Sequence, residues 1–117
     1  MHGVRVLECP AKGDPIRNER DAVDLIGAVA CRDAGLIAIP GSRLESDFFR
    51  LKTGVAGQIL QKFVTYRLRV AIVGDISKQV AESFALRDFV YECNRGDQIW
   101  FVQDLRELDE RLHGNRK

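Results

Sequence analysis

Histidine is scarce in this sequence, and cysteine occurs without a pairing pattern. The two histidines, His2 and His113, lie near the ends of the 117 residues, so no internal histidine is available for acid–base chemistry. The three cysteines, Cys9, Cys31 and Cys93, lack metal-ligand spacing. These features argue against a Cys/His zinc site. An odd number of cysteines without close pairs also argues against a disulfide framework and fits a reducing cytoplasm.

Long apolar runs and an excess of charge of either sign are also missing. No run approaches the roughly 20 residues that a membrane span needs, and the first residues, MHGVRVLECP, do not follow the pattern of a signal peptide. The 18 basic and 17 acidic residues give a net charge of +1. We therefore expect a cytoplasmic protein without a nucleic-acid or membrane partner.

The length and composition are those of one soluble globular domain. The chain is 45% hydrophobic and 30% charged, and its 117 residues are enough for one core but too few for two. We expect a single α/β domain over residues 1–117, with an ordered core from about residue 3 to residue 113 and a basic tail at 114–117.

The centre of the chain, from Thr53 to Ser77, predicts an amphipathic helix that leads into a buried strand. Apolar residues recur at helical spacing over its first part, at Val55, Ala56, Ile59, Leu60, Phe63 and Val64. An unbroken apolar run follows at 70–73, as in a strand that is covered on both faces. Gly74 and Asp75 stand where this strand would leave the sheet.

Strands and helices alternate over the whole chain. The predicted strands are 4–9, 36–39, 70–73 and 99–102. Asn18, Ser83 and Asp104 are the predicted N-terminal caps of helices, the last together with Glu107 in a capping-box-like arrangement. The alternation predicts a three-layer α/β domain with a mostly parallel, four-stranded sheet and right-handed crossovers.

The connection between the second strand and the central helix, residues 42–52, predicts a loop that contains one helical turn. It carries two adjacent aromatic residues, Phe48 and Phe49. We expect both rings to fold over the end of the sheet as a lid on the core.

Several long stretches carry a family resemblance. They read FFRLKTGVAGQILQKFVTYRLRVAIVGDIS, then ALRDFVYECNRG and IWFV. Over most of its length the chain closely resembles an uncharacterised bacterial family, domain of unknown function 4180. That family has no assigned activity, so the resemblance implies membership and leaves the function open.

A second resemblance concerns the order of the elements and the polar loop that leads into a helix after the second strand. Both are similar to the STAS domains, the sulfate-transporter and anti-sigma-factor-antagonist modules, and imply a STAS-like fold. Members of the antagonist kind bind partner kinases and are switched by phosphorylation of a Ser or Thr at the start of that helix. By position, the resemblance implies Ser42, Ser46 or Thr53 as phosphorylation candidates.

Polar residues at the carboxyl ends of the strands are the candidates for a ligand site, because sites in parallel α/β sheets form there. The Asp75 carboxylate could bind a cation or another ligand, or it could tighten a turn and cap the next helix. Ser42 and Ser77 belong to the same edge. Arg87 could hold a carboxylate or phosphate there, or form a surface salt bridge with Asp88.

Two further patterns have both a functional and a structural interpretation. Residues 53–57 could cradle an anion at a helix N-terminus. We favour close packing of Gly54 and Gly57 on the sheet, because the P-loop lysine and the third glycine of a dinucleotide fingerprint are missing. Cys31 and Cys93 could be nucleophiles, but we favour the core, because no histidine is placed to activate them. We therefore expect no cofactor, no metal and no catalytic residue.

Two functions of different classes remain. The first is a small interaction or regulatory module that binds a protein partner or its own copy as a homodimer. We expect this one, because the sequence has no paired catalytic carboxylates at a recognisable spacing and no cofactor fingerprint. The second is a small-molecule-binding protein or enzyme with a polar crevice at the strand ends. Its ligand-binding residues would be Ser42, Thr53, Asp75, Ser77 and Arg87.

Overall fold

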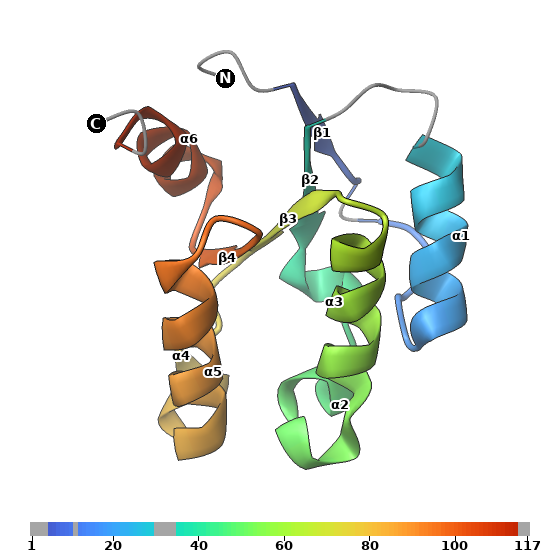
Figure 1. The fold of residues 1–117 in the computed structure, drawn as a ribbon. Coiled ribbons are helices and arrows are strands. Elements are labelled where there is room, and N and C mark those ends of the chain that lie inside the picture. The colour runs from blue at the N-terminus through green and yellow to red at the C-terminus, as the bar shows by residue number, and fades with distance from the viewer. Residues whose placement is uncertain (1–4, 11, 30–34, 115–117) are drawn as a thin grey trace.

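The sheet has four parallel strands that follow one another in space in the order of the sequence. The computed structural model describes residues 5–10, 12–29 and 35–114. Its strands β1 (Val6–Glu8), β2 (Leu36–Pro40), β3 (Arg69–Val73) and β4 (Ile99–Val102) form one sheet in the order β1-β2-β3-β4 (Figure 1). Each neighbouring pair is parallel. The predicted α/β class and four-stranded sheet are therefore confirmed, and the sheet is parallel throughout.

Helices connect the strands and follow the last one. They are α1 (Glu19–Val29), α2 (Ser46–Phe49), α3 (Val55–Thr65), α4 (Ser77–Ala81), α5 (Phe84–Arg95) and α6 (Leu105–Gly114). Short 3₁₀ turns at Gly41–Arg43 and Leu51–Thr53 flank α2, so the region 42–52 holds one α-helical turn between two tighter ones. β1 is shorter than the predicted strand 4–9, whose first residue lies outside the described residues.

The two faces of the sheet carry separate hydrophobic clusters. Because successive side chains of a strand point to opposite faces, Ile37 and Ile39 of β2 join one cluster while Leu36 and Ala38 join the other. The larger cluster receives apolar side chains from α1, α3 and α5, and the smaller one from α6. In Figure 1, α1 and α3 lie side by side, and α6 lies on the other side of the strands.

Burial on both faces explains the unbroken apolar run of β3, and a pair of aromatic rings closes one end of the larger cluster. Ile72 in β3 is only 1% exposed. Phe48 and Phe49 of α2 are 1% and 8% exposed, with their ring centroids 5.2 Å apart in an edge-to-face arrangement. Phe48 also lies 6.5 Å from the ring of Phe101 in β4. The predicted aromatic lid is confirmed, and each buried ring stabilises the fold by about 2 kcal/mol.

The three predicted helix caps are formed. Each side chain accepts a hydrogen bond from the backbone N–H three residues further on, at 3.0 Å for Asn18, 3.1 Å for Ser83 and 2.8 Å for Asp104. These bonds satisfy N–H groups that have no partner inside the helix. The box at α6 differs in one detail, because the Glu107 carboxylate accepts the N–H of Gln103, at 2.6 Å, and not that of the cap residue.

The packing role predicted for the glycines at the start of α3 is wrong. A Cβ added to Gly57 would meet no atom within 4 Å, and Gly57 is exposed, so this residue does not bring the helix close to the sheet. Gly54 also faces open space. It joins the 3₁₀ turn to α3 with a backbone φ of 79°, a left-handed conformation that glycine adopts without strain. Larger side chains make the contact instead, among them Ile59 and Phe63.

Polar side chains contact the outer strand β4 through hydrogen bonds and cation–π interactions. The Asn94 amide of α5 accepts the backbone N–H of Phe101 at 2.7 Å and donates to its carbonyl at 3.2 Å, which supplies pairing to an edge strand. The guanidinium groups of Arg69 and Arg111 lie over the ring of Trp100, 4.8 and 4.4 Å from its centroid. Arg69, at the start of β3, therefore helps to cover the buried indole.

Replacing Ile72 by Asp should unfold the domain, because an unpaired carboxylate would enter the larger hydrophobic cluster, where Ile72 is 1% exposed. Circular dichroism during thermal unfolding is the measurement. Ile72→Val, which removes one methylene at the same place, is the control and should cost only about 0.5–1.5 kcal/mol. An Ile72→Asp variant that stays soluble and melts cooperatively would contradict the placement of β3.

Candidate functional site

A cavity of about 560 Å³ lies at the carboxyl ends of β2 and β3. Two glycines, Gly41 and Gly74, lie next to each other there. A Cβ on Gly74 would make an ordinary contact with the backbone nitrogen of Gly41, at 3.6 Å, and it is the φ of Gly74, 152°, that favours glycine. Ser42, Asp75 and residues of α2 and α4 line the cavity. It occupies the edge of the sheet at which the sequence predicts a site.

Asp75 forms a turn at this edge. Its carboxylate accepts the backbone N–H of Ser77, the first residue of α4, at 2.9 Å. Hydrogen bonds from the Ser77 side chain and then from its backbone hold the pKa of Asp75 below its usual value. The structural interpretation of Asp75 is thus visible in its hydrogen bonds, while a role in ligand binding stays a prediction.

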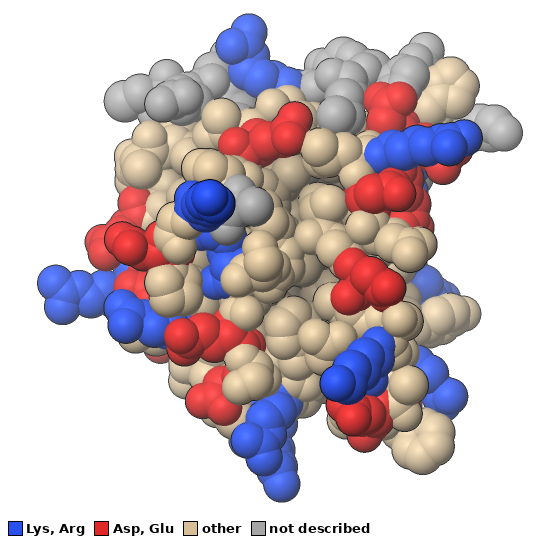
Figure 2. Space-filling view, turned by 180° about the vertical axis from the view of Figure 1, so that it is seen from behind, with Lys and Arg blue, Asp and Glu red and all other residues tan. Residues whose placement is uncertain are grey.

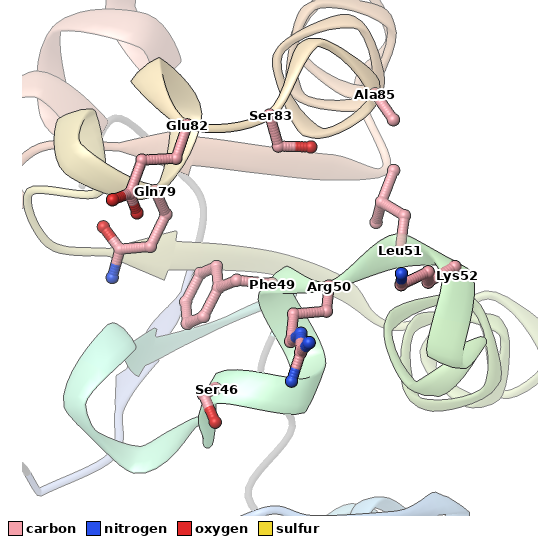
Figure 3. A pocket seen from close by; sticks show the side chains of 9 residues that line it. All are labelled: Ser46, Phe49, Arg50, Leu51, Lys52, Gln79, Glu82, Ser83 and Ala85. Carbon is pink, nitrogen blue, oxygen red and sulfur yellow. The ribbon is translucent and has the colours of Figure 1, made fainter.

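A second cavity, of about 680 Å³, adjoins the first. The two cavities share three lining residues, Ser46, Phe49 and Gln79. Figure 3 shows that the second cavity has walls of different charge. Arg50 and Lys52 come from the segment after α2, and Glu82 comes from the end of α4 on the opposite side.

The structure brings only some of the predicted site residues together. Ser42 and Asp75 line the cavity between β2 and β3, and Asp75 and Ser77 line a smaller one of about 280 Å³ beside it. The described lining of these cavities, and of the 680 Å³ cavity, does not include Thr53 or Arg87.

Local hydrogen bonds occupy the hydroxyl group of Thr53. The oxygen lies 2.8 Å from the backbone carbonyls of Asp47 and Arg50, to which it can donate, and it accepts the N–H of the first α3 residue at 3.2 Å. Ser42 and Ser46 are exposed and belong to the cavities at the strand ends. Phosphorylation at any of the three positions stays a prediction.

The outward side of α5 carries two exposed aromatic residues that the sequence pattern did not indicate. Phe84 and Tyr91 are 76% and 63% exposed, and their spacing of seven residues, two helical turns, places them on one side. The Arg87 guanidinium lies 4.8 Å from the ring centroid of Phe84, and that of Arg95 lies 5.8 Å from Tyr91. Arg87 also forms an exposed ion pair with Asp88, at 3.9 Å, and so belongs to this side of α5 and not to the strand-end crevice.

The described cysteines lie in the core. Cys9 is 8% exposed, and Cys93 is half-buried against the larger cluster. Burial raises the pKa of both thiols, and it raises that of Cys93 to about 11. Few thiolate groups are therefore present at neutral pH. Cys31 lies outside the described residues, so its expected place in the core stays a prediction.

Other kinds of site find little support in the described part of the chain. Residues 5–10, 12–29 and 35–114 contain no cluster of three His, Cys, Asp or Glu side chains that could hold a metal ion. Within the same ranges no helix has the length and apolar character needed to cross a membrane. On the face drawn in Figure 2, acidic and basic side chains are interspersed, without a large described patch of one sign.

Comparison with known families supplies an identification. The chain matches the family model described as "Domain of unknown function (DUF4180)" over residues 1–112. It belongs to this family. The predicted membership is therefore confirmed, and it brings no activity with it. No curated protein and no solved structure matches the chain. The likeness to STAS domains stays a prediction.

Replacing Asp75 by Asn should leave the melting temperature within about 2 °C of wild type, because the amide oxygen still accepts the N–H of Ser77. Asp75→Ala, which removes the acceptor, should melt lower. The measurement is a thermal melt of each variant against a panel of metal ions and metabolites. A ligand that raises the wild-type melt by clearly more than about 2 °C but has no effect on Asp75→Asn would show that the carboxylate binds ligand.

Cys93 should react slowly with a thiol reagent near pH 7.5, and its native rate should rise as the pH approaches its pKa of about 11. After denaturation, the thiol should regain its ordinary pKa and react quickly. The measurement is site-resolved mass spectrometry of labelled peptides over time. Fast labelling of the native protein at neutral pH would contradict a core role for Cys93.

Proposed function

We propose that this domain is a cytoplasmic interaction module that binds another protein chain through one side of α5. We call this side the outer α5 face and define it by Phe84, Asp88, Tyr91 and Arg95, with Arg87 beside Phe84. The observation that carries the proposal is the pair of aromatic rings, 76% and 63% exposed, on one side of one helix. Exposed apolar surface that gathers on one face marks binding surfaces.

The residue types of the outer α5 face are those of protein interfaces. Aromatic residues and arginine are enriched at interface centres, where they supply much of the binding energy. Covering both rings would contribute about 3–5 kcal/mol. Arg87 and Arg95 already lie over the rings, so they lose less side-chain freedom on binding than unrestrained arginines would. These properties support protein binding over catalysis.

A second candidate function is the binding of a small polar molecule in the two adjoining cavities. Their volumes, about 560 and 680 Å³, are in the range of ligand sites. The side chains of Arg50, Lys52 and Glu82 form no hydrogen bond or ion pair with other described residues, so a ligand with an anionic and a cationic group would suit the walls. This function is second because no polar side chain among the described residues is buried to orient a ligand.

Photo-crosslinking tests the protein-binding proposal. A benzophenone amino acid is placed at Phe84 in one variant and at Tyr91 in another, and the cells are irradiated. The matched control carries the same group at Tyr66, an aromatic residue that is 53% exposed at the end of α3. We expect protein adducts from both α5 positions and none from Tyr66, with mass spectrometry identifying the captured chain.

The captured chain must then bind the purified domain and lose that binding when Phe84 is replaced by Ser. Because Phe84 is 76% exposed, this substitution should leave the fold intact, which a thermal melt checks. Adducts of equal yield from Tyr66, or none from either α5 position, would overturn the proposal.

A further inference from the structure

The outer α5 face has a polarity along its length. Phe84, Asp88, Tyr91 and Arg95 stand at intervals of four, three and four residues, which places them in one line on an α-helix. The acidic residue lies nearer the start of the helix, and the basic residue is its last. The Asp88 side chain is 77% exposed and pairs with Arg87 at 3.9 Å, and that of Arg95 is 64% exposed and pairs with Glu92 at 3.4 Å. Exposed pairs of this kind contribute little to stability, so a partner can replace them.

We propose that the partner of the outer α5 face is a second copy of this chain, with the two α5 helices packed antiparallel around a two-fold axis near Tyr91. This inference rests on the proposed protein-binding function. Asp88 and Arg95 are seven residues apart, about 10 Å along the helix, and Tyr91 lies close to their midpoint. Reversing the second helix therefore brings each Asp88 opposite the partner's Arg95, twice in one interface.

The same arrangement accounts for the other residues of the face. The two Tyr91 rings meet near the axis, where aromatic residues pack well at interface centres. The two helices overlap over Asp88–Arg95, and each Phe84 lies about one helical turn beyond the partner's Arg95, the last residue of its α5. The two helix dipoles run in opposite directions over this overlap, which is the favourable arrangement. A parallel arrangement would instead put Asp88 beside Asp88 and Arg95 beside Arg95, which like-charge repulsion disfavours.

Charge also argues against partners of other kinds. The exposed charges of this side of α5 are Arg87 and Arg95 against Asp88 and Glu92, which balance. A nucleic acid or an anionic membrane would meet two carboxylates among these four charges, and a strongly acidic or basic protein would meet as much repulsion as attraction. The best complement to an acidic–basic line is the same line reversed, which a second copy provides.

One pair of helix faces makes a small interface. It buries less than the roughly 800 Å² per partner of a standard stable complex. We therefore expect a reversible dimer with a dissociation constant of about 1–100 µM. Dimerisation would then depend on the concentration of the protein.

Charge reversal tests the pairing, with sedimentation equilibrium from about 1 µM to 1 mM as the measurement. Asp88→Arg and Arg95→Asp should each weaken the wild-type dimer at least tenfold, because each puts like charges together at two symmetric places. The double variant exchanges the charges and should return to within about threefold of wild type. Asp24→Arg on α1 and Arg106→Asp on α6, both exposed, are the matched controls and should not change dimerisation. Thermal melts confirm that each variant is folded.

Each other outcome overturns the inference. It fails if wild type is a monomer over the whole range, if the single reversals bind as wild type does, or if the double variant stays as weak as the single ones. The crosslinking experiment separates this failure from that of the proposed function. Adducts from Phe84 and Tyr91 to a different protein, with a monomeric wild type, leave the proposed function standing, whereas no adduct of any kind removes both.

Discussion

The sequential order of the parallel strands is the constraint on which the rest of the structure depends. When each strand pairs with the next, crossovers of one hand bring every connecting helix to the same face of the sheet. Among the described residues, the opposite face is then left to α6, the helix that follows the last strand. One helix covers only part of a sheet face. The guanidinium groups of Arg69 and Arg111 over Trp100 extend that cover at the edge, and Asn94 pairs with β4 where a fifth strand would otherwise lie.

The same topology determines what kind of crevice the sheet offers. Open α/β sheets bind ligands where the strand order reverses, because the helices diverge to opposite faces there. The order β1-β2-β3-β4 has no reversal. The cavities at the carboxyl edge arise instead from the long connection between β2 and α3, which folds back with Phe48 and Phe49 buried and leaves space against α4. Such a space is bounded by surface side chains, which explains why its charged residues are not buried.

Features that leave a pattern in the local sequence could be predicted, and the direction in which a single residue faces in the folded domain could not. The caps Asn18, Ser83 and Asp104 were predictable because cap and N–H donor are three residues apart. The buried strands were predictable because only a doubly covered strand tolerates an unbroken apolar run. By contrast, Gly57 faces solvent, although glycine is the residue expected where a helix packs closely on a sheet. Whether the crevice included Arg87 depended on the rotation of α5, which the capping of the helix does not determine.

Helix α5 lies between the larger cavity and the outer α5 face. Ser83, its cap, and Ala85 line the larger cavity, while Phe84 between them carries the exposed ring of the outer α5 face. Successive helical residues point about 100° apart, so one turn of backbone serves both surfaces without either set of side chains blocking the other. A ligand in the cavity and a chain on the outer α5 face are therefore compatible by geometry. Coupling between them would need a ligand that binds the domain with different affinity when the outer α5 face is occupied and when it is free. The first turn of α5, which both surfaces share, is the place where such a difference would arise.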